Sequence, residues 1–266
     1  MRTVKLVCGA IVLAGVLAVV AAGQTSVPTV AVSAGGSSIT LQPASSIAGG
    51  PTRFDFTRRG RGDVNVALVT LRAGVTTDQL RRTLSSRNQD AALALVFVEA
   101  SASLSNATPT RSLTVDLRPN VTYVAVSLRG RSFALATFTT GAPNGARAPA
   151  ADATIRMVDY GFRGPSALPR NGSIRVANRG TALHFAEAFP LRPGVSDKRI
   201  GGALRDGDEK AFGRLVAGEP VSVQDVISPG STNDNRVRFQ RRGRYAFVCF
   251  FGEHNKLGMY RVFRVR

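Results

Sequence analysis

Residues 243–265 read GRYAFVCFFGEHNKLGMYRVFRV, and this stretch decides the fold. Apolar side chains occupy both alternating faces of residues 245–250, which is typical of a central strand in a β-sandwich. A loop follows that strand and leads into another apolar strand at the end of the chain. Cys249 ends the first strand, and His254 and Met259 follow it with the spacing Cys-x4-His-x4-Met. The stretch therefore predicts a core strand, a loop with three side chains that can bind a metal, and a return strand.

The chain carries the same pattern of strands and turns twice. The turns at residues 72–75 and 192–195 both read Arg-x-Gly-Val and lie 120 positions apart. Each turn is followed by a short segment with helical spacing, at residues 77–84 and 197–204. Each half closes with two apolar strands. Short strands separated by turn residues, with one helical insertion in each half, predict an all-β fold of two sandwich domains with similar topology.

The segment between the halves, TGAPNGARAPAAD at residues 140–152, has the composition of a linker. The predicted organisation is a signal peptide at residues 1–24, a metal-free domain at 25–141, a linker at 142–152 and a metal-binding domain at 153–266.

Residues 1–24 have the pattern of a secretory signal peptide. Arg2 and Lys5 precede an apolar run over residues 6–22, and small residues follow where a peptidase could cut. The prediction is an exported protein, located in the periplasm, in the cell envelope or in the medium. An uncleaved membrane anchor is the alternative, because the apolar run is at the lower limit of membrane-spanning length.

The chain is strongly basic, with 35 Lys and Arg against 17 Asp and Glu and a formal net charge of +18. Such charge attracts anionic surfaces, which for an exported protein are envelope polymers, phospholipid headgroups or acidic redox partners. Nucleic acid is not an expected partner, because the basic residues are spread along the chain and no nucleic-acid motif occurs. A solvated, arginine-rich surface without a partner is the alternative interpretation.

Soft metal ligands are concentrated in the last third of the chain. Outside residues 1–24 the sequence has one cysteine, Cys249, and two histidines, His184 and His254. A thiolate and two imidazoles, with a weak thioether from Met259, suit copper in both oxidation states. Copper is favoured over zinc because a thioether is a poor zinc ligand. Each residue taken singly has a structural alternative, since a lone buried cysteine is usually a small core side chain.

The C-terminal half resembles the cupredoxin family, the blue copper proteins of the plastocyanin and azurin type. The residues that carry the resemblance are, in chain order, Asn178-x-Gly180 ahead of His184, Gly243-x-Tyr245-x-Phe247-x-Cys249, Gly252-x-His254, and Gly258-Met259 followed by Phe263 and Val265. The resemblance implies two cupredoxin-like Greek-key β-sandwich domains and one type 1 copper ion. It also implies the ligand roles, which are imidazole for His184 and His254, thiolate for Cys249 and axial thioether for Met259.

Two features depart from the family pattern. Phe185 stands where many cupredoxins have an asparagine that braces the ligand loop, so the contacts behind the ligands need other residues. Residues 196–219 form an insertion with a charged helix, whose role the sequence does not reveal.

The N-terminal half resembles the family only in outline. Val64 aligns with His184 and Ser127 aligns with Cys249, and residues 25–150 contain no histidine, cysteine or methionine. The first half is therefore predicted to hold no copper and to act as a scaffold.

The predicted function is one-electron transfer by an exported mononuclear copper protein that turns over no substrate. Multicopper oxidases need many more histidines than the two present, and neither Glu187 nor Glu253 has a second catalytic partner. The predicted partner is a redox protein, for which an acidic surface is one option, and no small-molecule substrate is expected. Two alternatives stay open, a copper-binding or delivery protein and a metal-free binding module for anionic envelope partners.

Overall fold

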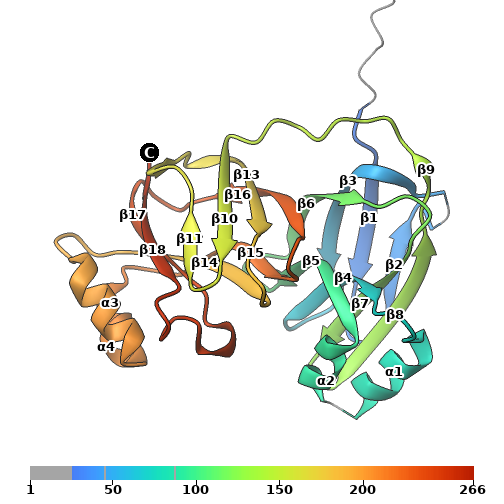
Figure 1. The fold of residues 1–266 in the computed structure, drawn as a ribbon, viewed down its shortest axis with the longest axis horizontal. Coiled ribbons are helices and arrows are strands. Elements are labelled where there is room, and N and C mark those ends of the chain that lie inside the picture. Colours follow the sequence, from blue (N-terminus) through green and yellow to red (C-terminus); the bar gives the residue numbers. More distant parts are fainter. Residues whose placement is uncertain (1–25, 45, 87) are drawn as a thin grey trace, which may run out of the picture.

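A computed structural model of the chain describes residues 26–44, 46–86 and 88–266 (Figure 1). The predicted signal peptide, with Cys8, lies outside the described residues. Among the described residues, no helix combines the length and the apolar character needed to cross a membrane.

Strands predominate in both halves, as the sequence predicts, with a pair of short helices in each. The elements of the N-terminal half are β1 (Thr29–Ala34), β2 (Ile39–Gln42), β3 (Ala48–Arg58), β4 (Val64–Leu71), α1 (Thr77–Ser85), α2 (Gln89–Ala94), β5 (Val96–Leu104), β6 (Thr110–Leu117), β7 (Thr122–Arg129), β8 (Ser132–Thr139) and β9 (Gly141–Pro143). Those of the C-terminal half are β10 (Ala153–Val158), β11 (Gly161–Arg163), β12 (Ala167–Leu168), β13 (Asn171–Asn178), β14 (His184–Pro190), α3 (Asp197–Arg205), α4 (Glu209–Leu215), β15 (Val221–Ile227), β16 (Thr232–Arg238), β17 (Gly243–Val248), the 3-10 helix η1 (Phe251–Glu253) and β18 (Tyr260–Val265).

The first helix of each pair begins where a capping side chain precedes it. Thr76 and Gln79 form a capping box at the start of α1, and the Ser196 hydroxyl accepts a hydrogen bond from the Arg199 amide at the start of α3. Such side chains satisfy amide groups that have no partner inside the helix. Both helices cover the segments predicted for them and extend one residue further.

The two halves share one strand order, which confirms the repeat read from the sequence. In the N-terminal half, β2-β1-β3-β6 form one sheet and β5-β4-β7-β8 the other. In the C-terminal half the corresponding orders are β11-β10-β13-β16 and β15-β14-β17-β18, with β12 added beside β18. Matching pairs also run in matching directions, since β1 is parallel to β3 and β10 is parallel to β13. The predicted all-β sandwich architecture is confirmed.

The second sheet of each half is buried on both faces. Tyr245, Phe247 and Cys249 point into the core between the two sheets, whereas Ala246 and Val248 join a separate cluster beneath α3 and α4. Fully burying a side chain such as Phe247 contributes about 1.5–3 kcal/mol. The helical insertion therefore explains why both faces of this strand are apolar, and β17 is a central strand as predicted.

The halves are joined edge to edge by their equivalent strands. β6 pairs antiparallel with β16, with Leu113 opposite Asn235 and Thr114 opposite Asp234, so the first sheets of both halves form one continuous sheet. Pairing removes two exposed edges that would otherwise invite association with other chains. The proposed domain boundaries stay a prediction.

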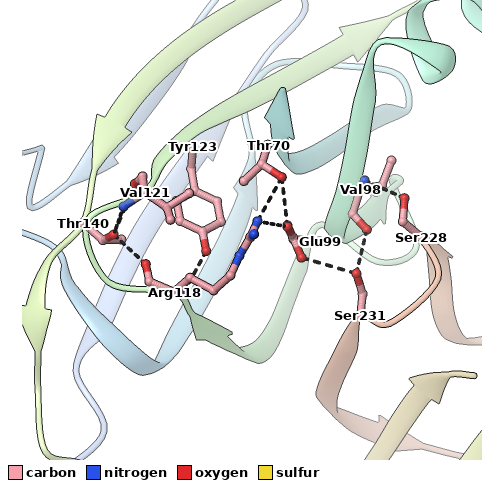
Figure 2. A network of polar contacts seen from close by, with 9 residues as sticks. All are labelled: Thr70, Val98, Glu99, Arg118, Val121, Tyr123, Thr140, Ser228 and Ser231. Atoms are coloured by element: carbon pink, nitrogen blue, oxygen red, sulfur yellow. Dashed lines mark hydrogen bonds and ion pairs between the residues drawn. The ribbon is translucent and has the colours of Figure 1, made fainter. Parts of the chain in front are cut away.

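Side chains reinforce this junction beside β5. Glu99 accepts a hydrogen bond from the Arg118 guanidinium at 2.8 Å and another from the Ser231 hydroxyl of the other half at 3.3 Å (Figure 2). Val98 exchanges backbone and side-chain hydrogen bonds with Ser228 and accepts one from the Ser231 hydroxyl at 3.2 Å. These hydrogen bonds give the buried side chains of Ser228 and Ser231 partners in the other half.

A largely buried ion pair lies further along the same junction. The Arg111 side chain is 9% exposed and the Asp225 side chain 16% exposed, and the two groups are in direct contact. Asp225 also accepts hydrogen bonds from the amide and the hydroxyl of Ser103, at 2.9 and 3.0 Å. The pair connects β6 to β15 and is held by groups from both halves.

Candidate metal centre

Four elements of the C-terminal half bring the predicted ligands to one end of its sandwich. His184 is the first residue of β14, Cys249 directly follows β17, His254 follows η1, and Met259 directly precedes β18. His184, Cys249 and Met259 are 0% exposed and His254 is 7% exposed. Three of the positions are strand ends, so the regular backbone of the sheet determines where the side chains lie.

Three of the four side chains present their ligand atoms to one another. The Nδ1 atoms of His184 and His254 are 3.1 Å apart, and Cys249 Sγ lies 3.7 Å from His254 Nδ1. Ligand atoms of all three residues lie within 4.8 Å of one another. For comparison, ligands at bond lengths of about 2.0–2.3 Å and tetrahedral angles are separated by roughly 3.3–3.6 Å. The group therefore fits a single metal ion.

Met259 is tied to the same site through its backbone. Its amide donates to the His254 carbonyl oxygen at 2.9 Å, and its carbonyl oxygen accepts from the Cys249 amide at 3.2 Å. Its side chain belongs to the same buried cluster as Cys249. The two residues that flank the loop are thus hydrogen-bonded to each other.

The loop between Cys249 and Met259 is a series of tight turns. The His254 amide donates to the Phe251 carbonyl oxygen at 3.0 Å, and later amides in the loop make similar short-range bonds. Gly252 and Gly258 have φ angles of +53° and +97°. Glycine adopts this left-handed region without steric cost, so the two glycines of the family pattern have a conformational role.

Asp159 contacts His184 from the side away from the other ligands, and sequence reasoning missed it. Its Oδ1 atom lies 3.2 Å from His184 Nε2. The carboxylate is held in place by the amide and the hydroxyl of Thr181, at 2.8 and 2.9 Å, and these hydrogen bonds lower the pKa of Asp159. An ionised carboxylate that accepts the Nε2 hydrogen leaves Nδ1 of His184 free as a ligand atom.

Gly180 makes room for this contact. A Cβ atom at position 180 would lie 2.4 Å from Asp159 Oδ1 and 2.6 Å from His184 Nε2. The neighbouring Asn178 orders the turn, because its side-chain amide donates to the carbonyl oxygens of Ala182 and Ile227 and its oxygen accepts from the Gly180 amide. The Asn178-x-Gly180 pattern therefore supports His184, whereas no pattern in the sequence links Asp159 to it.

The Cys249 sulfur is buried and accepts weak hydrogen bonds. Burial raises the pKa of the Cys249 thiol, and hydrogen bonds from the backbone amides of Phe185 and Phe251 act in the opposite direction. The Phe185 amide lies 3.5 Å from the sulfur. The backbone of Phe185 thus supports the ligand group at the position where an asparagine side chain is common in cupredoxins.

Burial of the two histidines favours the neutral form that metal ligation requires. Burial lowers the pKa of His184, with the nearby His254 as a further cause, and burial also lowers the pKa of His254.

The Tyr160 ring packs edge-on against the His254 ring with 5.5 Å between their centres, and Tyr160 and Leu257 are exposed. His254 is therefore the ligand side chain nearest the surface.

The described residues of the N-terminal half contain no comparable group. Val64 begins β4 as His184 begins β14, and Ser127 occupies the position of Cys249 in β7. The buried Ser127 hydroxyl donates to the Gly35 carbonyl oxygen at 2.5 Å. Within the described residues, His184, Cys249 and His254 are the one group of three such side chains that meets at ligand distance.

Comparisons with known proteins give likenesses of structure only. No protein-family model matches the sequence, and the search of curated proteins found no match. Reduced auracyanin from Roseiflexus castenholzii is 18% identical over 42% of this chain and 94% of its own, with a TM-score of 0.29. Copper nitrite reductase from Nitrosomonas europaea is 11% identical over 91% of this chain and 94% of its own, with a TM-score of 0.27. TM-scores this low do not by themselves establish a fold or a function for the chain.

Proposed function

We propose that the C-terminal half binds one copper ion through His184, Cys249, His254 and Met259, and that the protein exchanges single electrons with a redox partner in the cell envelope. The observation that carries the proposal is that one thiol and two imidazoles meet in a buried position. All three side chains are buried, and their ligand atoms lie within 4.8 Å of one another. Export, the division into two domains and the metal-free scaffold role of the first half are parts of the same proposal.

The donor set favours copper. Two imidazoles and a thiolate with a nearby thioether are typical ligands of mononuclear copper in electron carriers, where a bound copper would supply one-electron chemistry. A closed zinc site more often has a further cysteine, histidine or carboxylate in place of methionine. The buried thiol also argues against a cysteine nucleophile, because burial raises the pKa of Cys249.

The surrounding residues would keep the ligands in place when an electron arrives or leaves. Asp159 fixes the ring of His184, and the amides of Phe185 and Phe251 donate toward the Cys249 sulfur. Strands β14 and β17, which meet at the site, are central in their sheet. They belong to a close-packed core, and such a core resists rearrangement. Rigid ligands reduce the rearrangement that a change of oxidation state demands.

The test is to load the purified protein with Cu(II) and to record visible and electron paramagnetic resonance spectra. A charge-transfer band from thiolate to copper is expected at one copper per chain, and Cys249→Ser should abolish it. Ser127→Ala, at the equivalent position of the other half, is the matched control and should leave the band unchanged. Copper that fails to bind at one ion per chain would overturn the proposal, and reversible one-electron voltammetry would distinguish a carrier from a delivery protein.

A further inference from the structure

A groove with a cavity volume of about 780 Å³ lies beside the loop that holds the proposed ligands. It is bounded by α4, by the segment at residues 216–220 and by loop residues between Phe250 and Lys256. Its floor includes three aromatic rings, Phe189, Phe212 and Phe250, which pack edge to face with centroids 5.1–6.2 Å apart. Helices α3 and α4 lie at the end of the molecule away from the N-terminal half (Figure 1). The volume is within the range of about 300–1,000 Å³ that is usual for ligand sites.

The rim of the groove is acidic in a strongly basic protein. Four exposed carboxylates line it, those of Asp208, Glu209, Glu219 and Glu253. Among the described lining residues Lys256 alone is basic, and it is paired with Glu253. The chain as a whole carries a net charge of +18. The summed charge of the residues that line the groove is therefore opposite in sign to the charge of the protein.

The groove has an ordered framework. The Asp208 side chain accepts a hydrogen bond from the Ala211 amide at 2.7 Å and so caps α4. The Asn255 side chain donates to the Leu204 carbonyl oxygen at 3.1 Å and ties the ligand loop to α3. Asn255 is itself buried. The ligand loop and α3, which both contribute lining residues, are thus connected by a buried hydrogen bond.

The repeat by itself does not create such a groove. Between the helices and the second sheet of the N-terminal half there is a pocket of about 130 Å³, lined by Ala, Val and Leu side chains and by Gln89. No carboxylate lines that pocket. The larger volume, the aromatic floor and the acidic rim are therefore particular to the half that carries the candidate metal centre.

We propose that this groove binds a basic, amphipathic segment of a partner protein. An apolar side chain of the segment packs on the aromatic floor, and lysine or arginine side chains reach the carboxylates of the rim. Long basic side chains suit such a surface, because their stems pack on apolar groups while their charged ends stay in water, and cations also bind aromatic faces. Charge complementarity selects this partner, in contrast to the acidic partners that the net charge of the protein attracts.

The test uses a labelled synthetic peptide, Gly-Lys-Arg-Leu-Phe-Lys-Arg-Gly, and the full chain with and without copper. Fluorescence anisotropy gives the affinity, and backbone amide shifts measured by NMR on the metal-free chain locate the peptide. We expect binding in both forms, with shifts in α4, in residues 216–220 and in the loop around Asn255. Because binding is measured without metal, failure here leaves the copper proposal untouched, and failure of copper binding leaves this one untouched.

Charge-removing variants then test the rim. Glu209→Gln with Glu219→Gln should weaken peptide binding about fivefold or more, as expected for two screened charge contacts. Asp90→Asn, an exposed carboxylate in the first turn of α2, is the matched control from the other half and should have no effect. Changing the peptide phenylalanine to alanine tests the floor without altering the protein and should also weaken binding.

Four results would overturn the proposal. The first is equal binding of a peptide in which glutamate replaces every lysine and arginine, and the second is unchanged affinity of the double variant. The third is benzyltrimethylammonium binding as tightly as the peptide, which would assign the groove to a small amphipathic cation. The fourth is self-association of the chain that the double variant abolishes, which would make a second copy the occupant.

Discussion

The two halves of the molecule share a strand order, a strand pairing and a pair of helices, yet within the described residues the C-terminal half alone brings together three buried side chains that could hold a metal ion. At the position of Cys249 the N-terminal half has Ser127, and at the position of Asp159 it has Gly36. Ser127 donates to the Gly35 carbonyl oxygen, so the buried polar group is satisfied within the protein. The comparison teaches that one strand arrangement accommodates either set of residues and that the candidate site depends on a few side chains placed on it.

The connection between the last two strands accounts for most of the difference. In the N-terminal half β7 and β8 are joined by a tight turn, and Arg129 pairs directly with Ser132. In the C-terminal half the loop at residues 249–259 joins β17 to β18 and carries three of the four predicted ligands. A two-residue turn has no room for those side chains.

The largest effect is expected from giving the C-terminal half the short turn that joins β7 and β8 in the N-terminal half. Replacing residues 249–259 by the short turn Arg-Gly-Arg-Ser should abolish copper binding, because three ligands are lost together. The strands should persist, since β7 and β8 already pair stably around this turn. Copper stoichiometry and far-ultraviolet circular dichroism are the measurements. Retention of one tightly bound copper would mean that the ligands lie elsewhere.

The next largest effect is expected at the junction between the two halves. Asp225→Asn should lower the free energy of unfolding by about 3 kcal/mol, because it leaves the buried Arg111 guanidinium without its counter-charge. Asp55→Asn is the control. It breaks the exposed pair with Arg53, whose side chains are 49% and 37% exposed, and should cost less than about 1 kcal/mol. Denaturant unfolding measures both losses of free energy. Equal losses would show that the ion pair at the junction contributes no more to stability than the exposed pair.

A smaller effect, on the affinity for copper, is expected from changing Asp159 beside His184. Asp159→Asn should weaken copper binding by about 10–100-fold, the usual effect of removing a carboxylate that orients a ligand histidine. Asp152→Asn is the matched control, because Asp152 also accepts a backbone amide hydrogen bond, from Ser173, but contacts no ligand. Competition with a chelator of known affinity gives the comparison. An identical loss in both variants would mean that Asp159 acts on the fold and not on His184.

The smallest predicted effect concerns Glu187, where the N-terminal half has Ala67. Burial, with the neighbouring Asp225 as a further cause, raises the pKa of Glu187. A carboxyl group with a raised pKa in the folded state favours folding at low pH, and that contribution is lost as pH rises from the unfolded pKa through the folded pKa. Glu187→Gln should therefore stabilise the protein above this range and have little effect below the ordinary glutamate pKa of about 4.3. Thermal unfolding over a pH series measures the difference, and a pH-independent effect would contradict the prediction.

Local patterns predicted the strands and the first helix of each pair with good accuracy, and they placed Cys249 and His254 in the loop where the structure brings them beside His184. The alternation of apolar residues in β17 is visible in the sequence because both of its faces are buried. Capping residues at Thr76 and Ser196 mark the helix starts for an equally local reason. The second helix of each pair, α2 and α4, is too short to produce a clear periodic signal.

The sequence alone determined that Cys249, His254 and Met259 share one short loop, that His184 is the remaining candidate ligand, and that the chain repeats its pattern of elements. Only the tertiary structure decided that Asp159 reaches His184, that β6 pairs with β16, and that an acidic groove lies beside the ligand loop. The physical reason is the distance along the chain between the groups in contact. Periodicity and spacing depend on the local structure of a strand or loop. These contacts depend instead on how separate strands and helices pack together.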